Sequence, residues 1–281
     1  MTDPRPLIRF QGVTRNDRGG YSGVFGLVNR LARAGRLSAA DERFRRESNR
    51  WYDAAYPHPS HVYERHPSAA AWFRTAAAQL IERVPGYLEI LDRHGVPYVV
   101  LRAEDPGTVV YEDPYQVVVV PHAVGTRAAT AEDAEFCFRL HRAAMGHLVD
   151  AVWGWDDDVQ RGYHDRAFTP GRCRIVQWRG RDAGLIDVRR DGDTIYLARI
   201  EITPELQGHG IGVRLITGLI DEADRDGKDL LLDVLVPNTG AYELYRRLGF
   251  RERYRHGDGL IKRRMGRTGD RRRTAGRSAG P

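Results

Sequence analysis

The fold is decided by one stretch, Ile200-Glu201-Ile202-Thr203-Pro204-Glu205-Leu206-Gln207-Gly208-His209-Gly210-Ile211-Gly212. Its first residues end an apolar strand, the proline turns the chain, and the glycines lead into an amphipathic helix over residues 213–223. Glycines at this spacing allow successive backbone N–H groups to point into one concavity at a helix N-terminus, which binds a pyrophosphate without a basic side chain. A glycine-rich turn without a ligand is the alternative that this stretch alone leaves open.

Two common phosphate-binding loops do not fit this stretch. A dinucleotide-binding loop needs Gly-x-Gly-x-x-Gly after the first strand of a βαβ unit, and a Walker A loop needs a lysine after its glycines. Here the spacing is Gly-x-Gly-x-Gly without a lysine. Strands are expected before it at residues 174–178, 183–189 and 194–202, and Asp191-Gly192 predicts a hairpin turn between the last two. The strands before the loop are therefore expected to be antiparallel.

A second stretch follows a buried strand at residues 230–236, and it reads Asn238-Thr239-Gly240-Ala241-Tyr242-Glu243-Leu244-Tyr245-Arg246-Arg247-Leu248-Gly249-Phe250. It matches Asn-x-x-Ala-x-x-Leu-Tyr-x-x-Leu-Gly-Phe, and the first stretch matches Gln/Arg-x-x-Gly-x-Gly/Ala. These are two signatures of the GNAT family of N-acetyltransferases, in the order and separation typical of that family. Residues 123–266 therefore resemble this family, which uses acetyl-CoA.

The resemblance implies an α+β fold with a mixed, mainly antiparallel sheet flanked by helices. In this family, the strands before and after the glycine-loop helix splay apart around the pantetheine arm of the coenzyme. Strand backbone would bind the pantetheine amide, loop N–H groups would bind the pyrophosphate, and an asparagine would hydrogen-bond the arm. The residues expected at these positions are Ile200, Ile202, Gln207, Gly208, His209, Gly210, Ile211, Gly212 and Asn238. No metal is expected.

The resemblance also implies that an amine attacks the thioester directly. Tyr245 would lie near the sulfur, where its hydroxyl would protonate or hydrogen-bond the departing CoA thiolate. The alternative for Tyr245 is a tyrosine buried in the core-facing stripe of its helix.

This chemistry also needs a group that takes the proton from the amine. Some relatives carry Glu or His early in the strand before the loop, but this chain has Tyr196 there, with an ordinary pKa of about 10. Glu201 is the nearest carboxylate, and it should point away from the core because its two isoleucine neighbours should face it. The alternatives are that Glu201 is only a solvated residue of the strand, that Asp187 on the preceding strand is the base, or that water relays the proton with no single essential carboxylate.

Aromatic and acidic side chains alternate in the segment expected to bind the acceptor, residues 147–160. Carboxylates next to indole rings suit a cationic amine, because ion pairing and cation–π attraction both favour it. We therefore expect Trp153 and Asp156 to bind the acceptor. Core packing of the tryptophan, and stabilisation of a helix N-terminus by Asp156–Asp158, explain the same pattern.

Three regions are expected: an N-terminal α+β domain of unknown role at residues 1–122, the acyltransferase domain at 123–266, and a disordered Arg-rich tail at 267–281. The N-terminal domain should contain helices over residues 27–34, 38–56 and 68–84, an interruption at Pro85-Gly86, and a continuation to residue 94. Strands should follow at residues 97–102, 108–112 and 115–120.

Composition excludes several classes of protein. The chain has 281 residues, 41% of them hydrophobic, and its apolar runs are too short to span a membrane. Its net charge is +6, but the segment from Lys262 onward holds eight Lys and Arg against one Asp, so the rest of the chain carries −1. A nucleic-acid partner is therefore not expected. Two cysteines provide no disulfide scaffold, which favours a reduced, cytoplasmic setting.

The sequence thus predicts a cytoplasmic N-acyltransferase with acetyl-CoA as donor and a primary amine of a small molecule or peptide as acceptor. The alternatives are a non-catalytic CoA- or RNA-binding protein with two domains, and an acyltransferase that uses a longer acyl-CoA. A homodimer is compatible with the sequence.

Overall fold

A computed structural model describes residues 6–16 and 19–269 of the chain. The chain divides into two compact units: Met1–His122 with Gly208–Gly210, and Ala123–Gln207 with Ile211–Pro281. The predicted tail lies mostly outside the described residues. Within them, the structure has no helix with both the length and the apolar character needed to span a membrane.

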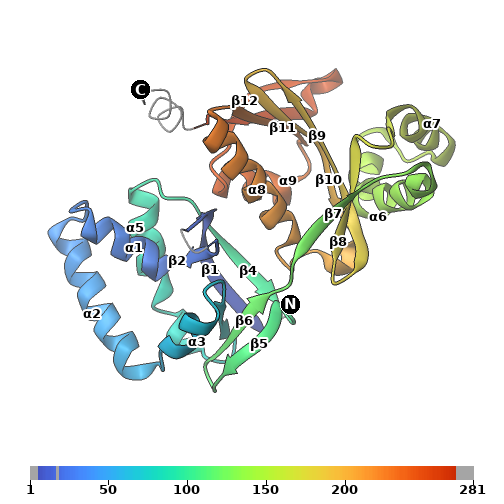
Figure 1. Cartoon of the computed structure of the whole chain (residues 1–281). Coiled ribbons are helices and arrows are strands. Elements are labelled where there is room, and N and C mark those ends of the chain that lie inside the picture. The colour runs from blue at the N-terminus through green and yellow to red at the C-terminus, as the bar shows by residue number, and fades with distance from the viewer. Residues whose placement is uncertain (1–5, 17–18, 270–281) are drawn as a thin grey trace, which may run out of the picture. The chain divides into compact units, whose positions relative to one another are not determined.

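The first unit contains an antiparallel sheet (Figure 1). Its strands pair in the order β2-β1-β3-β6-β5, and β4 pairs with β1. The bounds of the strands are β1 (Leu7–Arg15), β2 (Tyr21–Gly23), β3 (Ala70–Arg74), β4 (Tyr98–Ala103), β5 (Gly107–Glu112) and β6 (Gln116–Pro121). The helices are α1 (Val24–Arg33), α2 (Ala39–Ala55), α3 (Ser60–Arg65), α4 (Ala78–Ile81) and α5 (Val84–Arg93).

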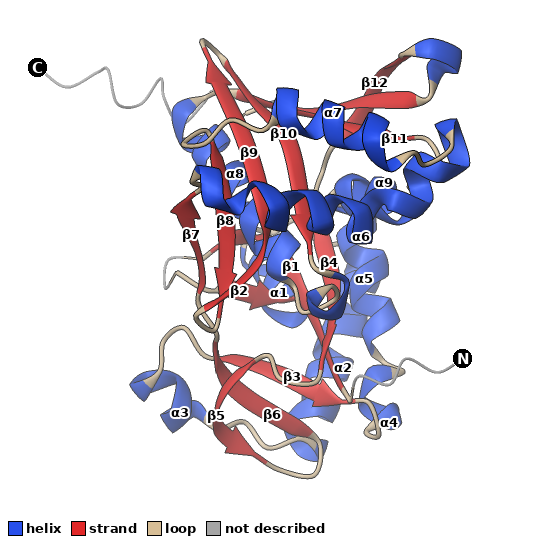
Figure 2. Cartoon of the chain, turned by 90° about the vertical axis from the view of Figure 1, so that its right-hand side faces the viewer, coloured by secondary structure: helices blue, strands red, loops and turns tan. Residues whose placement is uncertain are grey.

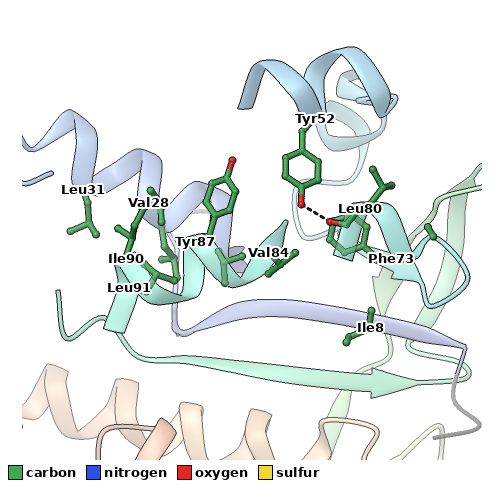
Figure 3. Close-up of a cluster of buried hydrophobic side chains, with 13 residues drawn as sticks. Ile8, Val28, Leu31, Tyr52, Phe73, Leu80, Val84, Tyr87, Ile90 and Leu91 are labelled. Carbon is green, nitrogen blue, oxygen red and sulfur yellow. Dashed lines mark hydrogen bonds between the residues drawn. The ribbon is translucent and has the colours of Figure 1, made fainter. Parts of the chain in front are cut away.

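Apolar side chains pack between these helices and the sheet (Figure 3). Val28 of α1 and Leu91 of α5 are fully buried, and Ile8 contributes from β1. The hydroxyl of Tyr52 on α2 donates a hydrogen bond to the carbonyl oxygen of Leu80 at 2.5 Å. This bond satisfies a polar group inside the core, where an unpaired one would be destabilising.

The predicted helix over residues 68–84 is wrong. Residues Ala70–Arg74 form β3, which pairs with both β1 and β6, and a short helix follows only at Ala78–Ile81. The alanine-rich sequence favours a helix locally, but burial of Trp72 between neighbouring strands prevails. Pro85 does not interrupt a helix either: it lies in the first turn of α5, where its fixed φ is suitable.

The second unit is a seven-stranded sheet with the order β12-β13-β11-β10-β9-β8-β7. Its strands are β7 (Val124–Ala128), β8 (Cys173–Trp178), β9 (Arg181–Asp191), β10 (Thr194–Ile202), β11 (Asp229–Leu235), β12 (Arg251–His256) and β13 (Lys262–Arg267). Neighbours are antiparallel except β10 and β11, which are parallel. The predicted mixed, mainly antiparallel sheet is confirmed.

Helices cover both faces of this sheet (Figures 1 and 2). On one face lie α6 (Ala134–Trp153) and α7 (Asp157–Ala167), and on the other lie α8 (Ile211–Asp226) and α9 (Thr239–Arg247). The helix α8 provides the crossover between the parallel strands β10 and β11. Thr130 and Asp133 form a capping box before α6, as their spacing predicts.

Candidate active site

The parallel strands β10 and β11 pair only over their first halves. Their register begins at Thr194 and Asp229 and ends at Leu197 and Leu232, although β10 continues to Ile202 and β11 to Leu235. A bulge in the pairing of β10 with β9 falls between Leu197 and Arg199, where β10 leaves β11. The second halves of the two strands therefore present backbone edges that are not paired with each other.

A cavity of about 740 Å³, which we call the central cavity, opens at these unpaired ends. Its walls come from α6, α7, β10, β11 and α9, with one residue of β13. The structure brings six of the predicted site residues into its lining: Trp153, Asp156, Ile200, Glu201, Asn238 and Tyr245.

Glu201 lies in the wall of the central cavity, but it is neither solvated nor free. It is 7% exposed, and its carboxylate is bound by two side chains. Arg199 donates from Nη2 to Oε2 at 3.0 Å and to Oε1 at 3.2 Å, and Nδ1 of His141 lies 2.8 Å from Oε1. Burial raises the pKa of Glu201, but the hydrogen bond from His141 and the charge of Arg199 hold that pKa below its ordinary value.

Sequence reasoning missed His141. It lies on α6, 60 residues before Glu201 in the chain, and it also lines the central cavity. No motif marks it, because its partner comes from a strand distant in the sequence. Only the packing of α6 against β10 brings the two side chains together.

Tyr245 lies on α9 with its side chain in the wall of the central cavity. It is 7% exposed, and burial raises its pKa to about 12. Within the described part of the chain, its hydroxyl has no hydrogen-bond partner. The phenol is thus protonated at neutral pH and free to donate a hydrogen bond into the cavity.

Asn238 has a local structural role in addition to its place in the cavity. It caps the N-terminus of α9, where its Oδ1 accepts a hydrogen bond from the backbone N–H of Ala241 at 3.1 Å. This cap uses one lone pair of the amide oxygen, and the Nδ2 group is left to donate a hydrogen bond to a ligand.

The side chains of Tyr196 and of Asp187, the other candidate for the base, are already bound to neighbouring residues. The hydroxyl of Tyr196 donates to Asp233 at 2.9 Å, and burial together with this interaction raises the pKa of Tyr196 to about 12. Asp233 also accepts two hydrogen bonds from Arg264. Asp187 is 2% exposed, pairs with Arg172 at 3.1 Å and does not line the central cavity.

In the acceptor segment, the structure agrees with a helix-capping role for Asp156 but not with core packing of Trp153. Trp153 is 53% exposed at the edge of the central cavity, so it does not pack in the core. Asp156 caps α7 by accepting from the N–H of Val159 at 2.9 Å, which leaves one carboxylate oxygen beside the cavity. Trp155 donates from its ring nitrogen to Asp157 at 2.8 Å.

The glycine loop has the backbone that its sequence requires. A 3₁₀ turn over Pro204–Leu206 follows β10, and φ is +81° at Gly208 and +76° at Gly210, values that favour glycine. The side-chain Nε2 of Gln207 donates to the carbonyl oxygen of Ile202 at 3.0 Å. This hydrogen bond occupies the carbonyl oxygen of Ile202. The residue itself is buried and does not line the central cavity.

Neither a metal cluster nor a reactive thiol is found among the described residues. These residues contain no group of three or more His, Cys, Asp or Glu side chains placed to hold a metal ion. Both Cys137 and Cys173 are buried, and burial raises the pKa of the Cys137 thiol to about 12. Such a thiol stays protonated and is a poor nucleophile.

Part of the chain is similar to known proteins. Residues 134–250 match the model of the acetyltransferase (GNAT) family. A stretch of 55 residues is 44% identical to an uncharacterised N-acetyltransferase of Methanocaldococcus jannaschii. That match covers 19% of this chain and 24% of the relative, so the chain spans only about a quarter of the relative's length.

Solved structures resemble about half of the chain. The PaiA N-acetyltransferase of Thermoplasma acidophilum, solved with coenzyme A, is 14% identical with a TM-score of 0.44, covering 52% of this chain and 99% of its own. The ribosomal-protein-S18-alanine N-acetyltransferase of Escherichia coli is 22% identical with a TM-score of 0.38. The match covers 52% of this chain and 94% of that protein. On the family match, the region from residue 134 to residue 250 belongs to the acetyltransferase (GNAT) family.

Proposed function

We propose that this protein is an N-acetyltransferase that moves an acetyl group from acetyl-CoA to a primary amine of a small molecule or peptide. The observation that supports this most is the separation of β10 and β11 after Leu197 and Leu232. Their unpaired ends open into a cavity that holds the protonated hydroxyl of Tyr245 and the buried carboxylate of Glu201.

The residues present fit a CoA-type co-substrate. An extended arm with amide groups matches the unpaired edges of β10 and β11, in the way that an added strand pairs with a sheet edge. Ile200 lies on the first of these edges, and Asn238 adds a free Nδ2 group from α9. When bound, the co-substrate supplies an acyl thioester whose carbonyl carbon accepts the amine.

The pyrophosphate is assigned to the loop over residues 207–212. Positive φ at Gly208 and Gly210 and the start of α8 at Ile211 suit an anion bound by backbone N–H groups. A Cβ atom added at Gly212 would meet nothing within 4 Å, so the backbone there is open to a ligand.

The chain's own residues provide the proton transfers. As the new C–N bond forms and the C–S bond breaks, one proton must leave the amine and one must reach the sulfur. The hydroxyl of Tyr245 is suited to the second transfer, because burial keeps it protonated and it lacks a partner among the described residues. The carboxylate of Glu201 also lines the cavity, and we assign it to the first transfer, either directly or through a neighbouring side chain.

The amine is assigned to the side of the central cavity formed by α6 and α7. The exposed ring of Trp153 and the free oxygen of Asp156 suit a cationic group there. Lys262 on β13 also lines the cavity, half-buried, and no residue that the structure describes binds its ammonium group. An acceptor that carries an anionic group as well as an amine would bind both charged side chains, with its amine near Asp156 and its anionic group near Lys262.

The test uses the full chain and two measurements. Calorimetric titration should show that acetyl-CoA binds, and thermal unfolding should show stabilisation that grows with ligand concentration. With acetyl-CoA and a panel of primary amines, free CoA thiol should appear, whereas amines already acetylated should release none. Absence of acetyl-CoA binding, or binding without thiol release for every amine, would contradict the proposal. Acyl-CoAs of increasing length then test the acetyl preference.

A further inference from the structure

We propose that His141 takes the proton from the attacking amine, and that Glu201 is a positioning residue that fixes the tautomer and orientation of this histidine. The proposal depends on the transferase function above, and it assigns a group to the step that the sequence left open. It rests on the arrangement of three side chains, Arg199, Glu201 and His141, in the wall of the central cavity.

The bonding of Glu201 makes it a poor proton acceptor. Both of its oxygens accept hydrogen bonds: Oε1 is within reach of His141 and Arg199, and Oε2 accepts from Arg199 at 3.0 Å. A proton arriving on this carboxylate would neutralise its charge and weaken its charge-assisted bonds in a buried site, which would leave the guanidinium less well paired.

The same bonding determines which nitrogen of His141 carries a proton. An ionised carboxylate only accepts hydrogen bonds, so Nδ1, which lies 2.8 Å from Oε1 of Glu201, must be the donor. In the neutral ring, Nε2 then carries the lone pair. No other residue in the described ranges bonds to this ring, so Nε2 is available for a ligand proton.

The position of His141 places this nitrogen within reach of a bound ligand. Its side chain is 21% exposed and lines the central cavity, whereas the side chain of Glu201 is 6% exposed. The ring of Trp155 lies 6.0 Å from the imidazole, centroid to centroid, and limits its movement. From the protein interior towards the cavity, the order is therefore the carboxylate of Glu201, the imidazole of His141 and the space that a bound amine would occupy.

The charged and titratable groups around His141 come from three segments. From β10 come Arg199 and Glu201, which bind each other. From α7 comes His164, which burial and the charge of Arg199 keep neutral by lowering its pKa. Asp157 lies at the start of α7, and it pairs with Arg142 of α6 at 3.0 Å.

Two protons move in the reaction, one from the amine to His141 and one from Tyr245 to the sulfur. The amine nitrogen bonds to the thioester carbon and gives one proton to Nε2 of His141, which becomes an imidazolium held by the negative charge of Glu201. The C–S bond breaks, and the sulfur receives a proton from the hydroxyl of Tyr245. Solvent then removes the proton from His141 and restores that of Tyr245, so no further reactant is needed.

The first experiment measures kinetics of His141→Gln, Glu201→Gln and a control histidine variant, His61→Gln. His61 is an exposed histidine on α3 that does not line the cavity and lies outside the acceptor segment. We expect His141→Gln to lower kcat by about 100-fold at pH 7 with unchanged acetyl-CoA affinity, and Glu201→Gln to lower it less. His61→Gln should match the unaltered protein. A loss of kcat in Glu201→Gln that exceeds the loss in His141→Gln would make Glu201 the base and overturn the proposal.

Chemical rescue separates a proton acceptor from a structural residue. Added imidazole should restore part of the activity of His141→Ala, with a rate that follows the neutral form of imidazole as pH is changed, and it should not restore Glu201→Gln. Thermal unfolding of each variant shows whether it is folded. A folded His141→Ala variant that imidazole does not accelerate would contradict the proposal.

A second readout does not need activity. In the ¹⁵N-labelled full chain without ligand, NMR should show the His141 ring protonated at Nδ1 and not at Nε2 at neutral pH, with His141→Gln identifying the signals. A ring protonated at Nε2 alone would overturn the inference even if the protein is a transferase. If instead no amine is acetylated but the Nδ1 tautomer is present, the proposed function fails and the arrangement of His141 and Glu201 stands.

Discussion

The two halves of β10 differ in pairing, burial and chemistry. From Thr194 to Leu197 the strand pairs with β9 on one side and β11 on the other, and Ile195 and Leu197 are buried among apolar neighbours. From Arg199 to Ile202 it still pairs with β9 but has left β11, and it carries the buried ion pair of Arg199 and Glu201.

This difference shows how one strand serves two purposes. The fully paired half contributes apolar burial to the fold, while the second half contributes unpaired backbone and charged side chains to the central cavity. Buried charges are costly unless they are paired and hydrogen-bonded, which is the case for Glu201. We therefore expect substitutions in the paired half to change stability, and substitutions around the open half to change binding or rate.

The largest effect is expected from Ile195→Ala, which removes a fully buried side chain of the paired half. It should lower the free energy of unfolding by about 3 kcal/mol, because it leaves a cavity between β9 and β11. The control is Ile200→Ala, which removes the same atoms from a partly exposed position and should cost about 1 kcal/mol. Urea unfolding at fixed pH measures both. Equal losses would mean that the two halves do not differ in stability.

The paired half could be predicted from sequence, and the open half only in part. Alternating and continuous apolar residues indicated the strands around the glycine loop, because burial imposes a period on the sequence. The glycines at 208 and 210 indicated a special backbone, which their positive φ confirms. The separation of β10 and β11 carries no local sequence signal, since it depends on where two strands distant in the chain stop pairing. Only the family resemblance predicts it.

The contacts of the site could not be predicted for the same reason. The neighbours of Glu201 in sequence placed its carboxylate on the cavity side but did not indicate Arg199 and His141 as its partners. In the first unit, the residues around Trp72 favour a helix by composition, yet pairing of β3 with β1 and β6 makes them a strand. In both cases the deciding contacts join residues that are far apart in the chain.

The next largest effect tests the chemistry assigned to the cavity. Tyr245→Phe removes the free hydroxyl and leaves the ring in place, so it should lower kcat by about 100-fold with little change in acetyl-CoA affinity. The control is Tyr242→Phe on the same helix. In this variant the aromatic ring at position 242 should keep its contact with the Arg263 guanidinium, which lies 4.2 Å from the ring centroid. Steady-state rates and calorimetric binding measure the two effects. An unchanged kcat in Tyr245→Phe would remove this hydroxyl from the reaction.

A smaller effect is expected at the start of α8, where affinity and stability should change in opposite directions. Gly212→Asp places a carboxylate at a helix N-terminus, which favours the helix, but beside the proposed pyrophosphate, which it repels. The dissociation constant for acetyl-CoA should rise about tenfold without loss of thermal stability. Gly218→Asp, on the same helix and also open to solvent at its Cβ position, should leave affinity unchanged. Equal affinities in both variants would place the pyrophosphate elsewhere.

The smallest effect concerns the acceptor and the charge at the start of β13. Lys262→Met keeps most of the aliphatic length of the side chain but removes the ammonium group that faces the central cavity. The KM should rise about fivefold for amines that carry a carboxylate or phosphate and stay constant for amines that do not, because a single solvent-accessible ion pair is worth at most about 1 kcal/mol. Lys228→Met, at the chain's other lysine, should change neither value. A uniform change in KM for both kinds of amine would show that Lys262 acts on the shape of the cavity rather than on the charge of the acceptor.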